Sequence, residues 1–235
     1  MKNKDSIYPR RLSGVRFNLS DDVFFIIRKK IMTREIRPGD RMNIDSLSRD
    51  LNVSQTPIRE ALARLEETGL VIKEPLKGFR ASQLLTQKEA QDLFNFRSVL
   101  EPYAAKIAAE YSTKEQIEQM YKEIDFAKEI QNFSGIEAFE KLAEHDETIH
   151  TQIFEAAGNV LLAKAYKTSH CFLHLYRLHF YRLHFVRDVP VDFEETMTEH
   201  TAIISALEMS DSHEAFSAMA QHIDNARNRF QYPAI

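Results

Sequence analysis

The stretch NIDSLSRDLNVSQTPIREALARLEETGL, residues 43–70, predicts two short amphipathic helices joined by a tight turn. Leu47 and Leu51 lie four residues apart on the first helix, so they share one face. On the second helix, apolar side chains recur at helical spacing at Ile58, Leu62 and Leu65. Each helix therefore has one face to bury and one to expose, as in a helix-turn-helix.

The turn and the ends of the second helix are also predicted. The turn falls on residues 52–54, and Ser54 is placed to cap the second helix through its hydroxyl. Pro57 fits the first turn because proline has no amide hydrogen to lose, and Gly69 closes the helix. The second helix of such a pair enters the major groove of DNA, so its exposed polar side chains are candidate contacts. The candidates are Arg49, Ser54, Gln55, Thr56 and Arg59, with Arg64 as a further one.

A short hairpin is predicted directly after this pair. Residues 70–80, LVIKEPLKGFR, favour two strands around a loop, which makes a winged helix. Lys77 and Gly78 fall at or near the wing tip, where a lysine beside a conformationally free glycine can approach a phosphate or the minor groove. The alternative is a plain β-hairpin turn without a role in DNA binding. The hairpin follows a helix-turn-helix directly, and this position favours the wing.

The residues before residue 43 predict one arm and one helix. Residues 1–18 contain three arginines without clear periodicity and indicate a flexible basic arm, which either touches the DNA backbone or is disordered. A helix is expected from Ser20, as its N-cap, to about Arg34, followed by a turn at residues 37–40. The DNA-binding domain is thus expected over residues 19–80.

The charges are divided unevenly along the chain. Residues 1–80 hold 17 basic and 11 acidic residues, whereas residues 81–235 hold the other 14 basic and 24 acidic residues. This division indicates that the first third meets a polyanion. The single cysteine, Cys171, excludes an internal disulfide and a cysteine zinc cluster. No signal peptide and no run of about 18 apolar residues is evident, so we expect a cytoplasmic location and no membrane partner.

The rest of the chain predicts helices only, and the protein is therefore expected to be mainly α. Residues 81–86 are the expected linker, and Thr86 with Glu89 forms a capping box that starts the first helix of a domain over residues 87–232. An antiparallel bundle of six helices is expected, because the connections are short and bundles build sites between facing helices. The expected helices cover residues 87–110, 114–132, 135–156, 160–186, 192–209 and 212–230.

Two parts of the sequence resemble known families. Residues 36–80 resemble the winged-helix domain of the GntR family of bacterial transcription regulators, through IRPGD at 36–40, the residues from Leu47 to Val53, SQTPIREAL at 54–62, and the matches at 65–66, 69–71 and 77–79. The remainder is similar to the FCD effector domain of the FadR-type subfamily. Its matches are Arg97, Glu101, Ala104, Ala105, Asp146, His150, residues 156–159, Glu199, His200 and His222.

One position departs from the family. The family usually has arginine where this chain has Gln55. Arginine favours the O6 and N7 atoms of guanine, whereas glutamine more often pairs with N6 and N7 of adenine. The operator sequence of the relatives therefore does not carry over to this chain.

The FCD resemblance implies a metal site. Asp146 and His150 lie one helical turn apart, while His200 and His222 fall on the last two predicted helices. One carboxylate and three imidazoles suit a divalent ion, with Zn²⁺ first and Ni²⁺, Mn²⁺ or Fe²⁺ as alternatives. Spacing alone does not single out these four residues; the resemblance does. The other histidines are expected to be surface or packing residues, with His174 as an alternative ligand: His145, His170, His174, His179, His184 and His213.

Arg97 is the candidate effector-binding residue. A guanidinium can hold a carboxylate through two hydrogen bonds, and effectors of the resembling domains are often small organic acids. The alternative is a surface salt bridge with Glu101, four residues along the same helix.

These observations favour a metabolite-responsive transcription regulator, expected to repress and to bind a palindromic double-stranded operator as a homodimer. A metal-dependent hydrolytic enzyme is one alternative, although no general base is evident beside the four ligands and the helix-turn-helix would be unexplained. A regulator with a purely structural metal is the other.

Overall fold

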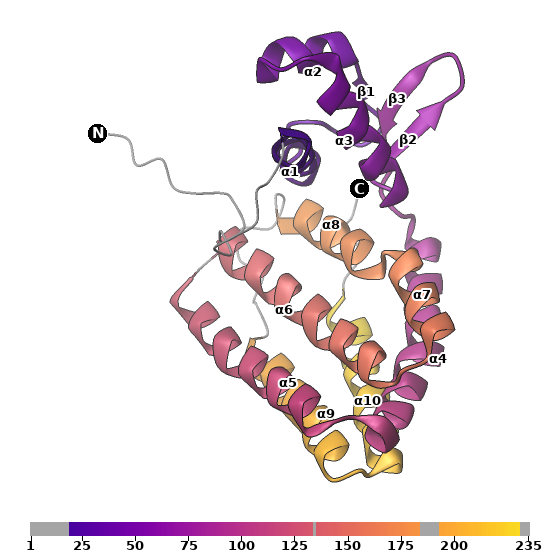
Figure 1. The fold of residues 1–235 in the computed structure, drawn as a ribbon, viewed down its shortest axis with the longest axis vertical. Helices are drawn as coiled ribbons and strands as arrows, with labels where there is room; N and C mark the ends of the chain where they lie inside the picture. The colour runs from indigo at the N-terminus through magenta and orange to yellow at the C-terminus, as the bar shows by residue number, and fades with distance from the viewer. Residues whose placement is uncertain (1–18, 134, 184–192, 231–235) are drawn as a thin grey trace. The chain divides into compact units, whose positions relative to one another are not determined.

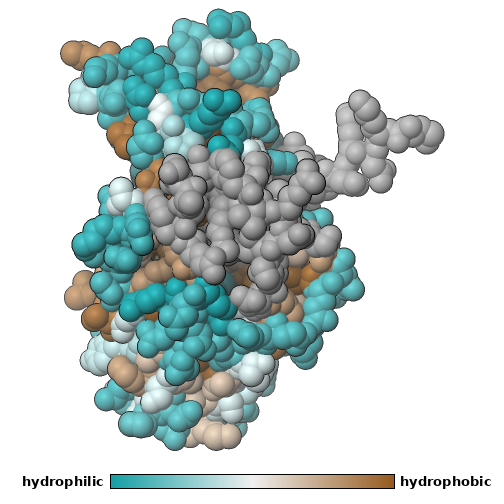
Figure 2. All heavy atoms as spheres, turned by 180° about the vertical axis from the view of Figure 1, so that it is seen from behind, coloured by the Kyte–Doolittle hydropathy of each residue, from teal (hydrophilic) through white to brown (hydrophobic). Residues whose placement is uncertain are grey.

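The computed structural model describes residues 19–133, 135–183 and 193–230 and divides between Leu84 and Leu85 into two compact units (Figure 1). The predicted basic arm, residues 1–18, lies outside the described residues, as do residues 134, 184–192 and 231–232 of the predicted helical domain (grey in Figure 1 and Figure 2). Within the described residues, no helix is long and apolar enough to cross a membrane.

The first unit is a winged helix-turn-helix, as predicted. Three antiparallel strands form one sheet in the order β1-β3-β2, with Met42 opposite Phe79 and Lys73 opposite Phe79 on its other side. The strand β1 was not expected, because two residues are too few to give an alternating pattern. The elements are α1 Leu19–Met32, β1 Arg41–Met42, α2 Ile44–Leu51, α3 Gln55–Glu67, β2 Val71–Glu74 and β3 Gly78–Ala81.

Helix α3 is the centre of this unit. Its apolar side chains Ile58, Leu62 and Leu65 are fully buried, and α1 packs against it through Ile27 and Ile31. Burial of these side chains is the main favourable term in the folding of the unit. Because one face of α3 is fixed against α1, its opposite face is held in the solvent.

One predicted capping hydrogen bond and one predicted helix start need correction. Ser54 lies at the N-cap of α3 with extended backbone, but its side chain makes no capping hydrogen bond. Ser20 lies inside α1 and is buried, and its hydroxyl donates to the carboxylate of Glu60 on α3. Both serines were placed by residue preference, which does not reveal a competing partner elsewhere in the fold.

The wing forms where it was predicted. Residues 75–77 connect β2 to β3, Lys77 is exposed, and Gly78 has φ of +90°, in the left-handed region that glycine adopts without strain. A Cβ atom added at Gly78 would meet nothing within 4 Å, so the wing tip is open.

The second unit is an all-helical bundle. Its elements are α4 Gln87–Tyr111, α5 Lys114–Ala127, the 3₁₀ helix η1 Lys128–Asn132, α6 Gly135–Ala156, α7 Val160–Ser169, α8 Cys171–Leu183, α9 Phe193–Glu208 and α10 Ser212–Arg229. Thr86 and Glu89 form the predicted capping box of α4. The fold class is therefore confirmed, although the number of helices is not the predicted six.

The predicted helix over 160–186 was wrong. His170 adopts a left-handed conformation with φ of +46°, ends α7, and lets α8 start at Cys171 in a new direction. Residues other than glycine seldom adopt this conformation, although histidine does so more often than most, and neither glycine nor proline marks the break in the sequence. The described residues of the bundle thus contain seven α-helices and one 3₁₀ helix.

Four helices surround one point in the bundle. Helix α4 contacts α6, α9 and α10, and α9 contacts α10. Small residues on α4, namely Ala104, Ala105 and Ala108, are fully buried and permit this close approach. Helices α4, α6, α9 and α10 lie together in the second unit (Figure 1), so side chains from these helices are close enough to share a site.

Candidate metal centre and nucleic-acid interface

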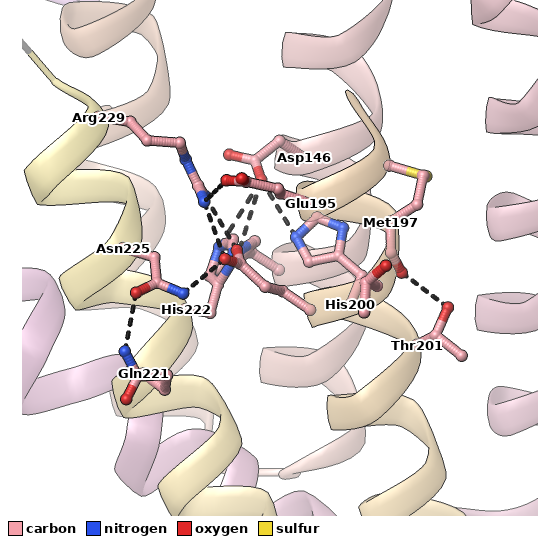
Figure 3. Close-up of polar contacts among 12 residues, drawn as sticks. Asp146, Glu195, Met197, His200, Thr201, Gln221, His222, Asn225 and Arg229 are labelled. Atoms are coloured by element: carbon pink, nitrogen blue, oxygen red, sulfur yellow. Dashed lines mark hydrogen bonds and ion pairs between the residues drawn. The ribbon is translucent and has the colours of Figure 1, made fainter. Parts of the chain in front are cut away.

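The structure brings the four predicted metal ligands together. Asp146 and His150 come from α6, His200 from α9 and His222 from α10, and one ligand atom from each lies within 4.8 Å of the others. The three histidines are at most 2% exposed. Asp146 extends towards His200 and His222 in Figure 3.

The inner atoms of the four side chains converge on one point. Nε2 of His150 lies 3.1 Å from Nε2 of His222. Oδ1 of Asp146 lies 3.2 Å from Nε2 of His200, 3.7 Å from that of His150 and 3.9 Å from that of His222. Ligands of an ion with bonds of about 2.1 Å would be separated by roughly 3.0 to 3.4 Å, depending on its geometry. Two of the separations, 3.1 and 3.2 Å, fall in this range, and the others are longer, up to 4.8 Å.

The outer nitrogens of two histidines face carboxylates. Nδ1 of His150 lies 2.5 Å from Glu101, and Nδ1 of His222 lies 2.7 Å from Glu199. An ionised carboxylate only accepts hydrogen bonds, so Nδ1 of His222 donates to Glu199 and its neutral ring keeps the lone pair on Nε2. Nδ1 of His150 faces Glu101 at short distance but forms no hydrogen bond of acceptable geometry with it. Carboxylates in this position fix the orientation of metal-binding histidines.

His200 is oriented through a second histidine. Its Nδ1 lies 3.0 Å from Nε2 of His145, whose own Nδ1 lies 3.1 Å from Glu123. If His145 donates to the carboxylate, its Nε2 accepts from Nδ1 of His200, and the lone pair of His200 is again on Nε2. That atom is buried and forms no hydrogen bond of acceptable geometry with the protein.

These contacts test whether the residues fit a metal ion. Nε2 of His150 and Nε2 of His222 lie 3.1 Å apart, and two bare nitrogens at this distance repel unless a proton or a cation lies between them. Nε2 of His200 is likewise a buried acceptor without a donor. The donor set of three nitrogens and one carboxylate is one that divalent transition metals prefer. The residues present therefore fit a divalent cation.

The electrostatics of the centre agree with this fit. Burial lowers the pKa of His200 to about 3 and also lowers that of His222, so both rings are neutral near pH 7. Burial raises the pKa of Asp146, but the three imidazoles that face the carboxylate, His200 first, outweigh it and hold the pKa well below its ordinary value. Neutral imidazoles beside an ionised carboxylate are the forms that bind metals.

Glu199 has a supporting network of its own. Both Nη atoms of Arg229 donate to its two oxygens, at 2.8 and 2.9 Å, and Asn225 donates to Oε1 at 2.7 Å. Figure 3 shows Arg229 and Asn225 on the outer side of His222. Burial raises the pKa of Glu199, but these hydrogen bonds outweigh it and keep the group ionised.

Arg97 pairs with Glu101, but not at the surface. Nε of Arg97 lies 2.5 Å from one oxygen and Nη2 donates at 3.2 Å to the other, and both residues are at most 2% exposed. The guanidinium carbon lies 4.7 Å from the ring centre of Phe172. The alternative expectation, a surface salt bridge between Arg97 and Glu101, was therefore right about the pair but wrong about the surface, because the pair is buried. Arg97 holds the carboxylate that contacts His150.

Sequence reasoning misplaced one histidine and overlooked the orienting carboxylates. His145 was expected to be a packing residue, but it is buried and bonded to His200. Glu123 carries no spacing signal, because its link to the site exists only in the folded bundle. His174, the alternative ligand, is partly buried on α8 and is not among the converging four. The side chains of His179 and His184 lie outside the described residues.

The predicted DNA contacts are all exposed. Arg49 lies near the end of α2, and the others lie at the start of α3 and on the wing. The exposed set is Arg49, Ser54, Gln55, Thr56, Arg59, Lys77 and Gly78. Arg64 needs correction, because its guanidinium pairs with Asp21 at 2.7 Å and covers the ring of Phe24. It supports the packing of α1 on α3.

Two family models match the chain. Residues 19–80 match the model of bacterial regulatory proteins of the gntR family, and residues 92–225 match the model of the FCD domain. These two ranges contain the winged helix-turn-helix and the converging histidines.

Two relatives are named as transcriptional regulators, and one solved structure has the same fold. The chain is 34% identical over 132 residues to the Nta operon transcriptional regulator of Aminobacter aminovorans, covering 56% of this chain and 60% of that regulator. It is 27% identical over 219 residues to the HTH-type transcriptional regulator LutR of Bacillus subtilis, covering 84% and 94%. The structure of McbR/YncC from E. coli has the same fold, with a TM-score of 0.68 at 17% identity over 91% of this chain and 97% of that one.

The outward contacts of the histidines predict their tautomers. Nδ1 of His150 and of His222 should carry hydrogen, because each faces a carboxylate. Long-range ¹H–¹⁵N correlation spectra of the full chain distinguish a protonated ring nitrogen from a bare one. His213 is the internal control, since it is exposed and water can satisfy either nitrogen. A bare Nδ1 on His222 would contradict the orientation described above.

Proposed function

This chain belongs to the GntR family of bacterial regulatory proteins, and we propose that it is a metabolite-responsive repressor whose FCD domain binds a divalent metal and a small carboxylic acid. Its DNA-binding role follows from the family. The proposed metal and effector sites are inferred from the convergence of three buried Nε2 atoms and one carboxylate oxygen. Nδ1 of each of the three rings contacts a carboxylate or another histidine.

The metal would be held by Asp146, His150, His200 and His222. Zn²⁺ is the first choice, and Ni²⁺, Mn²⁺ or Fe²⁺ suit the same donors. When bound, the ion supplies a positive charge and coordination positions that four protein ligands do not fill. A carboxylate on the effector is the natural partner for such a charge.

Arg97 is proposed to add a second contact to the effector. Two of its five N–H groups are used on Glu101, so three remain as donors. A carboxylate held by the metal and by this guanidinium would bind more tightly than one held by either alone. The alternative, a purely structural metal, predicts no affinity for acids.

Regulation requires the effector to distinguish two states of the protein. A ligand shifts an equilibrium only by the difference between its affinities for the two states. We propose that the acid favours the state with lower affinity for the operator, and that the repressor blocks transcription when the acid is absent.

The proposed homodimer is supported by an apolar stripe on α4. Val99, Tyr103 and Tyr111 recur at intervals of four or eight residues and are 71%, 49% and 67% exposed. Val160 and Leu161 on α7, which contacts α4, are 77% and 79% exposed. A second copy of the chain is the proposed occupant, because a palindromic operator needs two copies related by a twofold axis.

The first prediction concerns operator binding. The full chain should retard a palindromic DNA selected from a random pool, with two chains per operator. Arg59→Ala should weaken binding by about tenfold if that side chain reads a base. Lys77→Ala should weaken binding to all sequences alike and reduce the slope of log affinity against log salt by about one.

Lys114→Ala is the matched control for operator binding, since Lys114 is exposed at the start of α5 in the other unit. It should leave operator affinity unchanged. Equal effects of all three substitutions would contradict a specific role for α3 and the wing.

The second prediction concerns the metal. Wild-type protein should bind one Zn²⁺ per chain in competition with a chelating dye, and His200→Ala should abolish that binding. Glu199→Gln and His145→Ala should each weaken it by about 10- to 100-fold, because they act on the orientation of a ligand rather than on a ligand atom. His213→Ala, on the exposed side of α10, should have no effect. Unchanged Zn²⁺ affinity in His200→Ala would refute the proposed site.

The third prediction separates two roles of Arg97. Arg97→Lys keeps the charge but loses the planar fork, so it should lower the affinity of Zn²⁺-loaded protein for acids such as lactate or citrate by about tenfold in calorimetry. Zn²⁺ affinity is measured on the same variant. If only Zn²⁺ affinity falls, Arg97 acts on His150 through Glu101 and does not touch the effector.

A further inference from the structure

Gln55, the first residue of α3, is held by two neighbours. Its Nε2 donates to Oδ1 of Asp45 at 2.5 Å, and its Oε1 accepts from Nη2 of Arg59 at 3.1 Å. Asp45 lies in the first turn of α2, and Arg59 lies one turn further along α3. All three side chains are exposed on the face that the fold leaves in solvent.

These neighbours determine the orientation of the amide. A carboxylate can only accept hydrogen bonds and a guanidinium can only donate them. If the amide of Gln55 were turned over, its oxygen would face Asp45 and its N–H groups would face Arg59. Both contacts would then be repulsive. The two charged partners therefore fix which end of the amide is the donor.

The hydrogen-bonding capacity that remains on Gln55 is limited. An amide has two N–H donors and two lone pairs on its oxygen, and the protein uses one of each. One donor and one acceptor are left for DNA. In the major groove, adenine presents an acceptor at N7 and a donor at N6, whereas guanine presents two acceptors. Among the purines, the remaining pair of groups matches adenine.

We propose that Asp45 is a positioning residue for sequence recognition, which acts through Gln55 to make the protein select adenine at one base pair of each half-site. The proposal rests on the proposed function in one respect: the start of α3 enters the major groove. Asp45 itself need not touch a base. A merely structural role at the start of α2, where a negative charge favours the helix dipole, would change stability but not base preference.

The test uses the full-length chain and DNA selected from a random pool. Each base pair of the selected operator is then varied, and the affinity is measured by fluorescence anisotropy at one salt concentration. Gln55→Ala identifies the base pair that Gln55 reads, because discrimination is lost there and kept elsewhere. Wild type should prefer adenine at that position by roughly 10-fold or more.

Two substitutions of Asp45 separate orientation from charge. Asp45→Ala removes the acceptor, and the preference at the Gln55 position should fall to within about threefold, since a good pair of hydrogen bonds carries most of it. Asp45→Asn keeps an oxygen that accepts from Gln55, so it should retain most of the preference. Both substitutions remove one negative charge near DNA. The two variants should therefore gain a similar amount of sequence-independent affinity for DNA.

Several outcomes would overturn the proposal. Selection of guanine at the Gln55 position would do so, as would an Asp45→Ala variant that keeps the full preference for adenine. A change in preference at a different base pair from that of Gln55→Ala would show that Asp45 contacts DNA directly. If no sequence is enriched at all, the proposed operator binding fails instead, so the two failures are distinguishable.

Discussion

The bundle depends on the contacts behind its three buried imidazoles. Each imidazole is fixed at Nδ1, by Glu101, by Glu199 or by the pair His145 and Glu123, and so directs Nε2 inwards. A charge buried alone is costly, and two of these carboxylates have arginine partners of their own, Arg97 and Arg229. The residues that orient the imidazoles and the imidazoles themselves thus come from five helices, namely α4, α5, α6, α9 and α10.

Much of this could be predicted from the sequence, for a physical reason. Periodicity within α2 and α3 reports which residues share a face, so Ile58, Leu62 and Leu65 were placed in the core correctly. The four metal ligands came from a resemblance, because positions 146 and 222 are related only through the fold. The contacts of Glu123 and His145 could not be found, since a hydrogen bond between helices leaves no trace in spacing. The break at His170 was missed because no glycine or proline marks it, and a histidine alone does not predict a left-handed backbone.

Charged side chains orient polar groups in both units, but these groups are exposed in the first unit and buried in the second. On α3, Gln55 is oriented by charged neighbours yet remains exposed, so its polar groups stay available to a partner. In the bundle, the oriented groups are buried, and their polar atoms face one another. Hydrogen bonds from fixed charges preorganise both sites, which lowers the entropy lost on binding.

The burial of the histidines also governs how fast an ion can enter or leave. The side chains of His150, His200 and His222 are at most 2% exposed, whereas that of Asp146 is 21% exposed and forms the one ligand with an open side. Exchange must therefore pass Asp146 or await a local opening of α9 and α10, and such openings of packed helices are slow. An ion held as proposed would therefore exchange more slowly than one bound at an exposed site.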